Sequence, residues 1–411
     1  MIKNEYEKTL DVLKELKLPV YKNSTEVLKI NGVPLIMEDV IKGAVISRSN
    51  VLLLGERGEG KTQLLNDVLY SWFGSKGTYL RVTPDLDLKN LYQRINLEKL
   101  NEARNTDELR EITQRIANPI TVVDEINRAP AVVQNQLMNI CDGYIEINGI
   151  KYPLGYRGYS VGMATANFGN GRYAGTFDMD QAILDRFHLI IDIDNFYPKS
   201  TDTYDILTES TEPRIIETEE IDHTEEIISA HKCLKKRKTP LSVLIADLYL
   251  VHGFDYIDNK HVSSKRKLKS SLSSIEEAHE SASFHGLVFP ISKRAAKYLL
   301  NLYHAMEMVA ESKGFESKNE YSITNFFEVA KIALPYSGVL NTSKVETLYY
   351  GNPYECMKDV VEELKKLFKE KEDDIGVAIK EARNKKLTQH TLDKFSKDWE
   401  FFRDLLIRLN S

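Results

Sequence analysis

A glycine-rich segment, GERGEGKT at residues 55–62, stands at the end of the apolar run VLLLG and directly before a stretch with helical periodicity. The segment fulfils the pattern GxxxxGK[ST], in which glycines let the backbone fold around a phosphate with its N–H groups pointing inward. The N-terminus of the following helix adds positive potential. This feature therefore predicts a strand–loop–helix unit that binds phosphate, and with it an α/β fold.

The predicted nucleotide-binding residues are those of the loop and the first residue after it: Gly55, Glu56, Arg57, Gly58, Glu59, Gly60, Lys61, Thr62 and Gln63. Within this set, Lys61 is expected to reach the β and γ phosphates of a nucleoside triphosphate. The Thr62 hydroxyl is expected to ligate Mg²⁺.

A second motif, ITVVDEINRA at residues 120–129, ends an apolar run in two adjacent acids, Asp124 and Glu125. A strand that ends in this way places both carboxylates at the carboxyl edge of the sheet, where α/β proteins bind their ligands. Asp124 is expected to hold Mg²⁺ through its waters, which makes Thr62 and Asp124 the predicted metal ligands. Glu125 is expected to orient or deprotonate the attacking water.

Short apolar runs alternate with helical stretches along the first half of the chain, and the expected strands lie at residues 51–55, 78–82, 120–123, 161–166 and 187–193. This alternation predicts a five-stranded parallel sheet of the P-loop NTPase type, flanked by helices. Helical stretches are expected at residues 86–95 and 107–116, and Asn148–Gly149 predicts a hairpin turn within residues 144–160. Beyond residue 200 the pattern is mainly helical.

The length of 411 residues suggests two or three domains. The expected order is an N-terminal helix at 1–24, a nucleotide-binding α/β domain at 25–198, an insert or linker at 199–290, an all-α lid at 291–345 and a helical C-terminal extension at 346–411.

Composition narrows the class of protein further. A net charge of −6 gives no overall attraction to nucleic acid or anionic membrane, and basic runs at residues 235–238 and 265–269 are interpreted as solvated loops. The three cysteines are far apart and are expected to be reduced thiols. No apolar run approaches the roughly 20 residues that span a bilayer. A cytoplasmic protein without a membrane span is therefore expected.

The two motifs together resemble those of the AAA+ ATPases, and DEINRAP at residues 124–130 is similar to the signature of the MoxR family. Three further segments are similar to that family: TPDL at 83–86, ATANF at 164–168 and GTFDMDQAILDRF at 175–187. The family usually has Pro-Gly inside the phosphate loop. Glu56 and Arg57 stand there instead, which resembles the magnesium-chelatase-like branch of the same helix-2-insert clade.

The resemblance implies roles for further residues. Asn167 would be the polar sensor 1 residue, in contact with the γ-phosphate or the water. Arg186 would be an arginine finger that acts on the ATP of a neighbouring subunit, although a surface salt bridge is the alternative. Arg294, within ISKRA at residues 291–295, would be the sensor 2 residue that contacts the nucleotide. Arg128 could point to a neighbouring site or cap the turn between strand and helix.

The same resemblance implies that the hairpin at residues 144–160 is inserted in helix 2 and lines a central pore. Its aromatic residues, Tyr152, Tyr156 and Tyr159, could then grip a substrate, or they could pack the hairpin itself.

The function implied is that of an AAA+, MoxR-like ATPase that hydrolyses ATP with Mg²⁺ and remodels or matures a partner protein. It would act as a homo-oligomer, a hexameric ring, with a client or adaptor that can carry a von Willebrand A domain. One alternative is an AAA+ motor that acts on DNA or RNA, of the replication or restriction type. Another is a nucleotide-gated scaffold with little turnover.

Overall fold

The computed structural model describes residues 2–83, 86, 92–95, 110–147, 149–167, 179, 181–209, 215–257, 264–267, 284–315 and 322–411. Parts of the predicted segments lie outside these residues, namely Pro84, Asp85, Asn148, Phe168 and residues 175–178 and 180.

The chain forms two compact units, and each is considered by itself. Unit 1 comprises residues 1–27, 34–236 and 308–314. Unit 2 comprises residues 28–33, 237–307 and 315–411.

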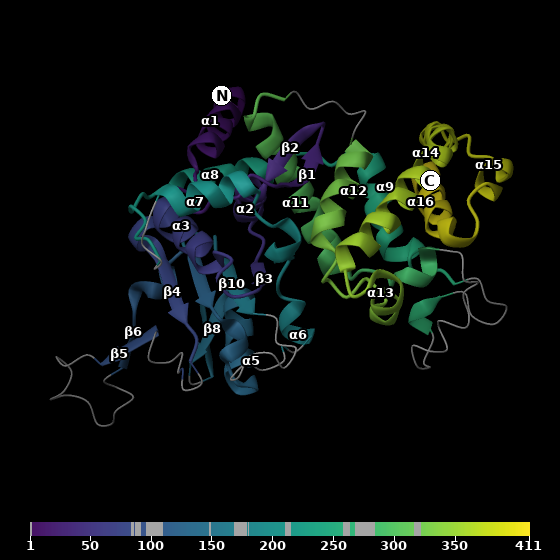
Figure 1. The fold of residues 1–411 in the computed structure, drawn as a ribbon. Coiled ribbons are helices and arrows are strands. Elements are labelled where there is room, and N and C mark those ends of the chain that lie inside the picture. The colour runs from purple at the N-terminus through teal and green to yellow at the C-terminus, as the bar shows by residue number, and fades with distance from the viewer. Residues whose placement is uncertain are drawn as a thin grey trace. The chain divides into compact units, whose positions relative to one another are not determined.

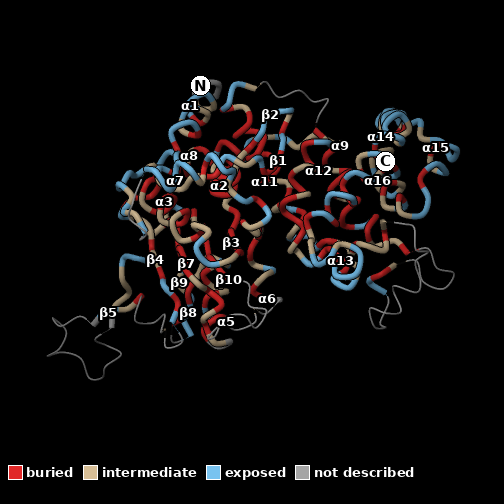
Figure 2. Tube along the Cα trace, viewed as in Figure 1, coloured by how far each residue is buried: buried red, intermediate tan, exposed pale blue. Residues whose placement is uncertain are grey.

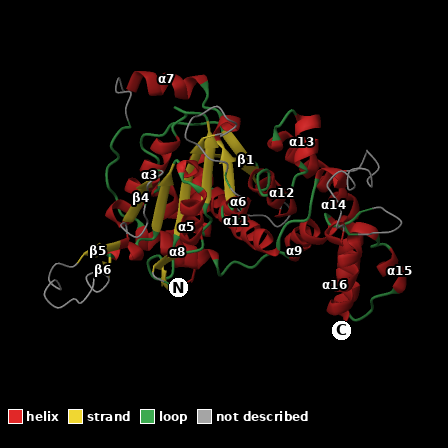
Figure 3. Cartoon of the chain, turned by 90° about the horizontal axis from the view of Figure 1, so that it is seen from below, coloured by secondary structure: helices red, strands yellow, loops and turns green. Residues whose placement is uncertain are grey.

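A five-stranded parallel sheet forms the centre of unit 1 (Figures 1 and 3). Its strands are β3 (Val51–Gly55), β4 (Gly77–Arg81), β7 (Ile120–Asp124), β10 (Val161–Asn167) and β11 (Leu189–Asp192), in the spatial order β11-β3-β10-β7-β4. Each lies in one of the predicted apolar runs or within two residues of its ends, so the predicted sheet is confirmed. Strands β3, β7 and β10 are buried along their whole length, as Figure 2 shows.

The helices of unit 1 include α3 (Lys61–Phe73) and α5 (Ala131–Cys141), which pack on this sheet. The others are α1 (Ile2–Glu15), α2 (Met37–Ser47), α6 (Gln181–Leu184), α7 (Ser200–Glu209) and α8 (Thr224–Leu234). The helix that follows the phosphate loop, α3, packs on β3, β4, β7 and β10. It buries Leu64, Leu65, Val68 and Trp72, whose helical spacing predicted this apolar face. A two-stranded pair, β1 (Glu26–Ile30) and β2 (Val33–Ile36), precedes α2.

The predicted hairpin is present as β8 (Tyr144–Ile147) and β9 (Ile150–Pro153), with Gly149 at a φ of 77° in its turn. Its expected insertion within a helix is wrong. Helix α5 ends before it, and the chain then enters β10 with no further helix. Gly155, Arg157 and Gly158 all have positive φ, a backbone conformation that a helix excludes.

A second antiparallel pair, β5 (Gln93–Ile95) and β6 (Arg110–Ile112), lies in the connection between β4 and β7. The expectation of helix at these residues is therefore also wrong.

The described part of unit 2 is mainly helical. Its helices are α9 (Leu241–Leu248), α11 (Lys293–Ser312, whose end belongs to unit 1), α12 (Ser322–Ala333), α13 (Thr342–Tyr349), α14 (Pro353–Arg383), α15 (Gln389–Asp393) and α16 (Glu400–Asn410). A π-helical turn, Tyr249–Gly253, follows α9. The ring of Tyr249 packs against Phe368 and Trp399, at centroid distances of 5.6 and 5.1 Å. Among the described residues, no helix is both long and apolar enough to cross a membrane.

Candidate nucleotide site

The phosphate loop follows β3 and depends on glycine at defined positions. Gly55, Gly58 and Gly60 have φ values of 147°, 90° and 78°, which side-chain-bearing residues rarely adopt. A Cβ on Gly55 would lie 2.8 Å from Ile193 Cγ1 and 2.9 Å from an oxygen of Asp194. The loop therefore has the backbone freedom that a phosphate cradle requires, and it ends at Gly60, the N-cap of α3.

Lys61 begins α3, and its ammonium group lies back over the loop. Its Nζ donates to the carbonyl oxygens of Gly55, at 2.8 Å, and Glu56. Burial lowers the pKa of Lys61, while the carboxylates of Asp194 and Glu59 act in the opposite direction. A cation held among carbonyl groups inside a loop of this shape is suited to bind a phosphate that enters the loop.

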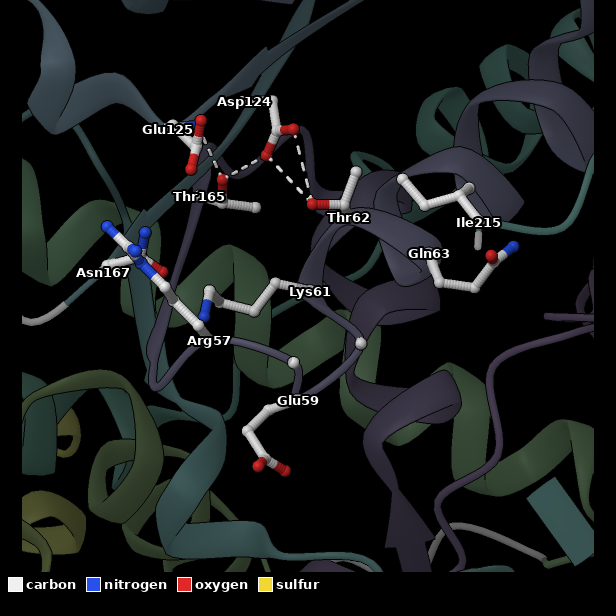
Figure 4. Close-up of a pocket in the computed structure, with 12 residues that line it drawn as sticks. Arg57, Glu59, Lys61, Thr62, Gln63, Asp124, Glu125, Thr165, Asn167 and Ile215 are labelled. Atoms are coloured by element: carbon white, nitrogen blue, oxygen red, sulfur yellow. Dashed lines mark hydrogen bonds between the residues drawn. The ribbon is translucent and has the colours of Figure 1, made fainter. Parts of the chain in front are cut away.

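The Thr62 hydroxyl and the Asp124 carboxylate meet at the edge of the sheet. Thr62 Oγ1 lies 3.2 Å from Asp124 Oδ1 and 3.4 Å from Oδ2, and Asp124 is buried (Figure 4). Hydroxyl and carboxylate oxygens are ligands that Mg²⁺ prefers, together with water and phosphate. The predicted metal ligands are thus adjacent, and their chemistry fits this ion.

Two hydroxyl groups that the sequence reasoning missed also hold the Asp124 carboxylate. Thr165 Oγ1, on β10, donates to Asp124 Oδ1 at 2.6 Å and accepts from the Glu125 backbone N–H at 2.8 Å. Tyr79 Oη, on β4, donates to Asp124 Oδ2 at 2.8 Å. Burial and this hydrogen bond raise the pKa of Tyr79, so its hydroxyl keeps the donated proton. Thr165 is a hydroxyl within the otherwise apolar part of β10, a signal that could have marked it, whereas Tyr79 stands between Thr78 and Arg81 in a mixed strand.

Removing the Tyr79 hydroxyl is expected to weaken Mg²⁺ binding while leaving metal-free nucleotide binding unchanged. Loss of an outer-shell partner of a metal ligand typically costs roughly 10- to 100-fold in metal affinity or activity. Tyr79→Phe should therefore require about 10-fold more Mg²⁺ for half-maximal tightening of ATP binding. A fluorescent ATP analogue titrated at fixed Mg²⁺ concentrations measures this, with the exposed Tyr197→Phe as control. An unchanged Mg²⁺ dependence would show that the hydroxyl does not position Asp124.

Glu125 follows β7 with a φ of 57°, an uncommon conformation for a residue with a side chain. Its Oε1 lies 3.0 Å from Arg128 Nη2 and its Oε2 lies 3.9 Å from Arg81 Nε. Arg128 thus contacts the acid of its own chain, within the turn after the strand. The catalytic candidate is thus held by Arg128, while its Oε2 makes no hydrogen bond to any described residue.

Asn167 ends β10 beside the phosphate loop, because it pairs with Gly55 in the register of β10 and β3. Its side chain lines the same cavity as Lys61, Thr62 and the acid pair. Figure 4 shows Asn167, Arg57 and Lys61 among the residues that line it. The cavity has a volume of about 420 Å³, within the usual range for ligand pockets.

Arg186, the predicted arginine finger, does not line this cavity. Arg186 donates from Nη1 to the Ala182 carbonyl at 2.7 Å, and its Nε lies 3.5 Å from Asp142. Arg294 lies in the first turn of α11, in unit 2, and is exposed. Their roles toward the nucleotide stay predictions.

The hairpin tyrosines differ in their surroundings. Tyr159 is buried: its hydroxyl donates to the Val45 carbonyl at 2.6 Å, so it packs inside the unit and cannot grip a substrate. Tyr156 donates to Glu225 at 3.0 Å. Tyr152 is partly exposed.

Residues of both basic runs form ion pairs or hydrogen bonds, although the runs were expected to be solvated loops. Lys236 pairs with Glu5 at 2.9 Å and Arg237 with Glu307 at 3.3 Å. Lys265 is buried and donates to three backbone carbonyl oxygens, and burial lowers its pKa to about 7. The expectation of a solvated loop is therefore wrong at Lys265. Residues 268–269 lie outside the described part of the chain.

Comparisons with known proteins agree with this geometry. Residues 50–187 match the family described as AAA domain (dynein-related subfamily), a range that contains the whole phosphate loop, the acid pair, Asn167 and Arg186. No curated protein matches the chain. A crystal structure from Cytophaga hutchinsonii ATCC 33406, described as that of a "putative ATPase", superposes with a TM-score of 0.58 at 17% identity, over 89% of this chain and 95% of that one. At this identity the likeness shows a shared fold. Residues 50–187 are thus similar to an AAA domain of the dynein-related subfamily, and this match supports ATP hydrolase activity.

Proposed function

We propose that this protein is a MoxR-like AAA+ ATPase that hydrolyses ATP with Mg²⁺ to remodel or mature a partner protein. The observation that carries the proposal is the convergence of Lys61, Thr62, Asp124, Glu125 and Asn167 on one cavity. The motif DEINRAP supports the MoxR-like assignment, whereas the Glu56–Arg57 pair is similar to the magnesium-chelatase-like branch.

Each residue of the site would have its own role in the transfer of the γ-phosphoryl group to water. Lys61 would leave the loop carbonyls to bind the β and γ phosphates, and Asn167 would hydrogen-bond the γ-phosphate or the water. Thr62 and Asp124 would hold Mg²⁺, which supplies neutralisation of phosphate charge when it is bound. Glu125 would orient or deprotonate the water once its carboxylate is released from Arg128.

Arg186 is proposed to complete the site of a neighbouring subunit in a homo-oligomeric ring. The proposed ring has six subunits. In one chain its guanidinium contacts Ala182 and Asp142 and does not line the cavity. An arginine supplied in trans to phosphoryl transfer is worth about 10³- to 10⁵-fold in turnover. A shared site would explain why this arginine lies apart from the nucleotide residues of its own chain.

Complementation between two inactive variants tests the shared site. Arg186→Ala and Lys61→Ala chains should each lose ATPase activity, whereas mixed rings should regain part of it. In a mixed ring, a subunit with intact Lys61 can receive Arg186 from its neighbour. The exposed Arg408→Ala is the control. Full turnover by Arg186→Ala in rings of normal size, measured by phosphate release and ultracentrifugation, would refute the role in trans.

The remodelling role is tested with the full chain and candidate partners. A von Willebrand A domain protein or another client should bind in the ATP state and dissociate after hydrolysis. ATP turnover that rises several-fold with DNA, with a steep salt dependence, would instead favour the motor.

A further inference from the structure

A segment after α7, residues 215–223, lies along α3 and is named the strap here. Its first contact with the helix is made by the side chain of Gln63, the residue that follows the phosphate loop. Gln63 Nε2 donates to the Ile216 carbonyl at 3.2 Å, and the Ile216 N–H donates to Gln63 Oε1 at 3.0 Å. Both polar groups of the Gln63 amide thus hold the backbone of the strap.

Further hydrogen bonds continue along the same helix. Thr218 Oγ1 donates to Asp67 Oδ1 at 2.7 Å, and the Ile221 N–H donates to the Tyr70 carbonyl at 2.8 Å. Gln63, Asp67 and Tyr70 follow one another at helical spacing, so they share one face of α3. The strap is therefore fixed to the helix whose N-terminus forms the phosphate site.

The strap brings an apolar side chain, Ile215, to the nucleotide cavity. Ile215 is 55% exposed, and it is the one aliphatic side chain among the described residues that line this cavity. The other lining residues are charged, carry an amide or a hydroxyl, or are glycine. In Figure 4, Ile215 and Gln63 lie on the side of Thr62 opposite to Asn167 and Arg57. The cavity thus has a polar end for phosphate and an apolar end at the strap.

We propose that Ile215 packs against the base of the bound nucleoside triphosphate, and that Gln63 positions it through the strap. The proposal rests on the proposed ATP binding and assigns the nucleoside end of that site. A nucleobase presents flat apolar faces, which an exposed aliphatic side chain covers with a gain from the removal of water. The Gln63 side chain, predicted to bind the nucleotide, instead acts as a positioning residue, because its amide is hydrogen-bonded to Ile216 and Asp67.

Two ligands separate the base from the phosphates: Mg²⁺-ATP and inorganic tripolyphosphate, which has no base. Ile215→Ser should weaken ATP binding at least about 10-fold, since loss of apolar groups from a pocket costs roughly 10- to 200-fold. Its affinity for tripolyphosphate should stay the same. Ile221→Ser is the matched control, because Ile221 lies on the same strap, is 43% exposed and does not line the cavity.

Calorimetric titration of the full chain distinguishes the outcomes. ATP affinity within about 2-fold of wild type in Ile215→Ser would overturn the base contact. An equal loss of ATP and tripolyphosphate binding would also overturn it, because the strap would then serve only to hold the phosphate loop. A wild-type chain that binds neither ligand would refute the proposed function itself, a different result from either.

Gln63→Met tests the positioning step, because methionine keeps the length of the side chain. It loses both hydrogen bonds to Ile216, together with the one that Gln63 Nε2 donates to Asp67 Oδ1 at 3.0 Å. It should reproduce the selective loss of ATP affinity. Hydrogen exchange gives a second readout: ATP, and not tripolyphosphate, should protect the backbone amide of Ile216. Protection by both ligands alike would contradict the assignment of the strap to the base.

Discussion

Replacing Lys61 by alanine is expected to lower the affinity for Mg²⁺-ATP roughly 10- to 100-fold, because charge-assisted hydrogen bonds contribute about 1.5–3 kcal/mol. In the structure the Lys61 ammonium group already lies inside the loop, bonded to the carbonyl oxygens of Gly55 and Glu56. No other lysine lines the described part of the cavity to replace it. Equilibrium dialysis with labelled ATP measures the loss.

The control for this change must separate lost binding from lost folding. Lys8→Ala removes an exposed lysine on α1 and should bind ATP like wild type. Lys61→Met retains the apolar part of the side chain, so an equal loss of affinity in Lys61→Met and Lys61→Ala would assign the effect to the charge. Equal affinity of wild type and Lys61→Ala would contradict the whole site assignment.

The sheet could be predicted because its strands are short apolar runs with clear ends. The runs that end at Gly55, Asp124 and Asn167 each place a functional residue at the carboxyl edge, as the parallel arrangement requires. These positions follow from local sequence alone. The loop, the acid pair and Asn167 could therefore be predicted from the sequence.

Residues that reach the site from a neighbouring strand of the sheet could not be predicted from the sequence. Tyr79 reaches Asp124 because β4 is the neighbour of β7, with Tyr79 paired to Val122. Thr165 reaches the same carboxylate from β10, on the other side of β7. Strand order comes from the path of the connections, which apolar periodicity does not encode.

The connections themselves were the weakest part of the prediction. The hairpin β8–β9 was recognised by its turn, but the positive φ of Gly155, Arg157 and Gly158 prevents a helix after it. The position of the strap at residues 215–223 depends on the Gln63 amide and on Asp67. A polar residue on a helix predicts that this face of the helix is exposed to solvent. Only the folded structure shows that another segment covers the face.

A large loss of turnover is expected when Glu125, the acid assigned to activate water, is replaced. Loss of a general base costs roughly 100- to 10,000-fold in rate. Glu125→Gln preserves the size of the side chain and tolerates the same φ of 57°. Lys61, Thr62 and Asp124, the groups assigned to phosphate and Mg²⁺, remain unchanged, so the variant should bind ATP with wild-type affinity and stay loaded.

Single-turnover hydrolysis measured beside ATP binding separates these two effects. Glu125→Gln should bind normally and release phosphate at least about 100-fold more slowly, while the exposed Glu146→Gln should match wild type in both.

The ion pair of Glu125 with Arg128 at 3.0 Å raises the question of whether Arg128 restrains or orients the carboxylate. Arg128→Ala should free the acid and leave hydrolysis intact or faster if the pair only restrains it, and slow it if Arg128 orients the carboxylate toward water. Hydrolysis by Glu125→Gln at the wild-type rate would mean that another group activates the water. Glu59 and Asp124 are the other acids among the described residues that line the cavity.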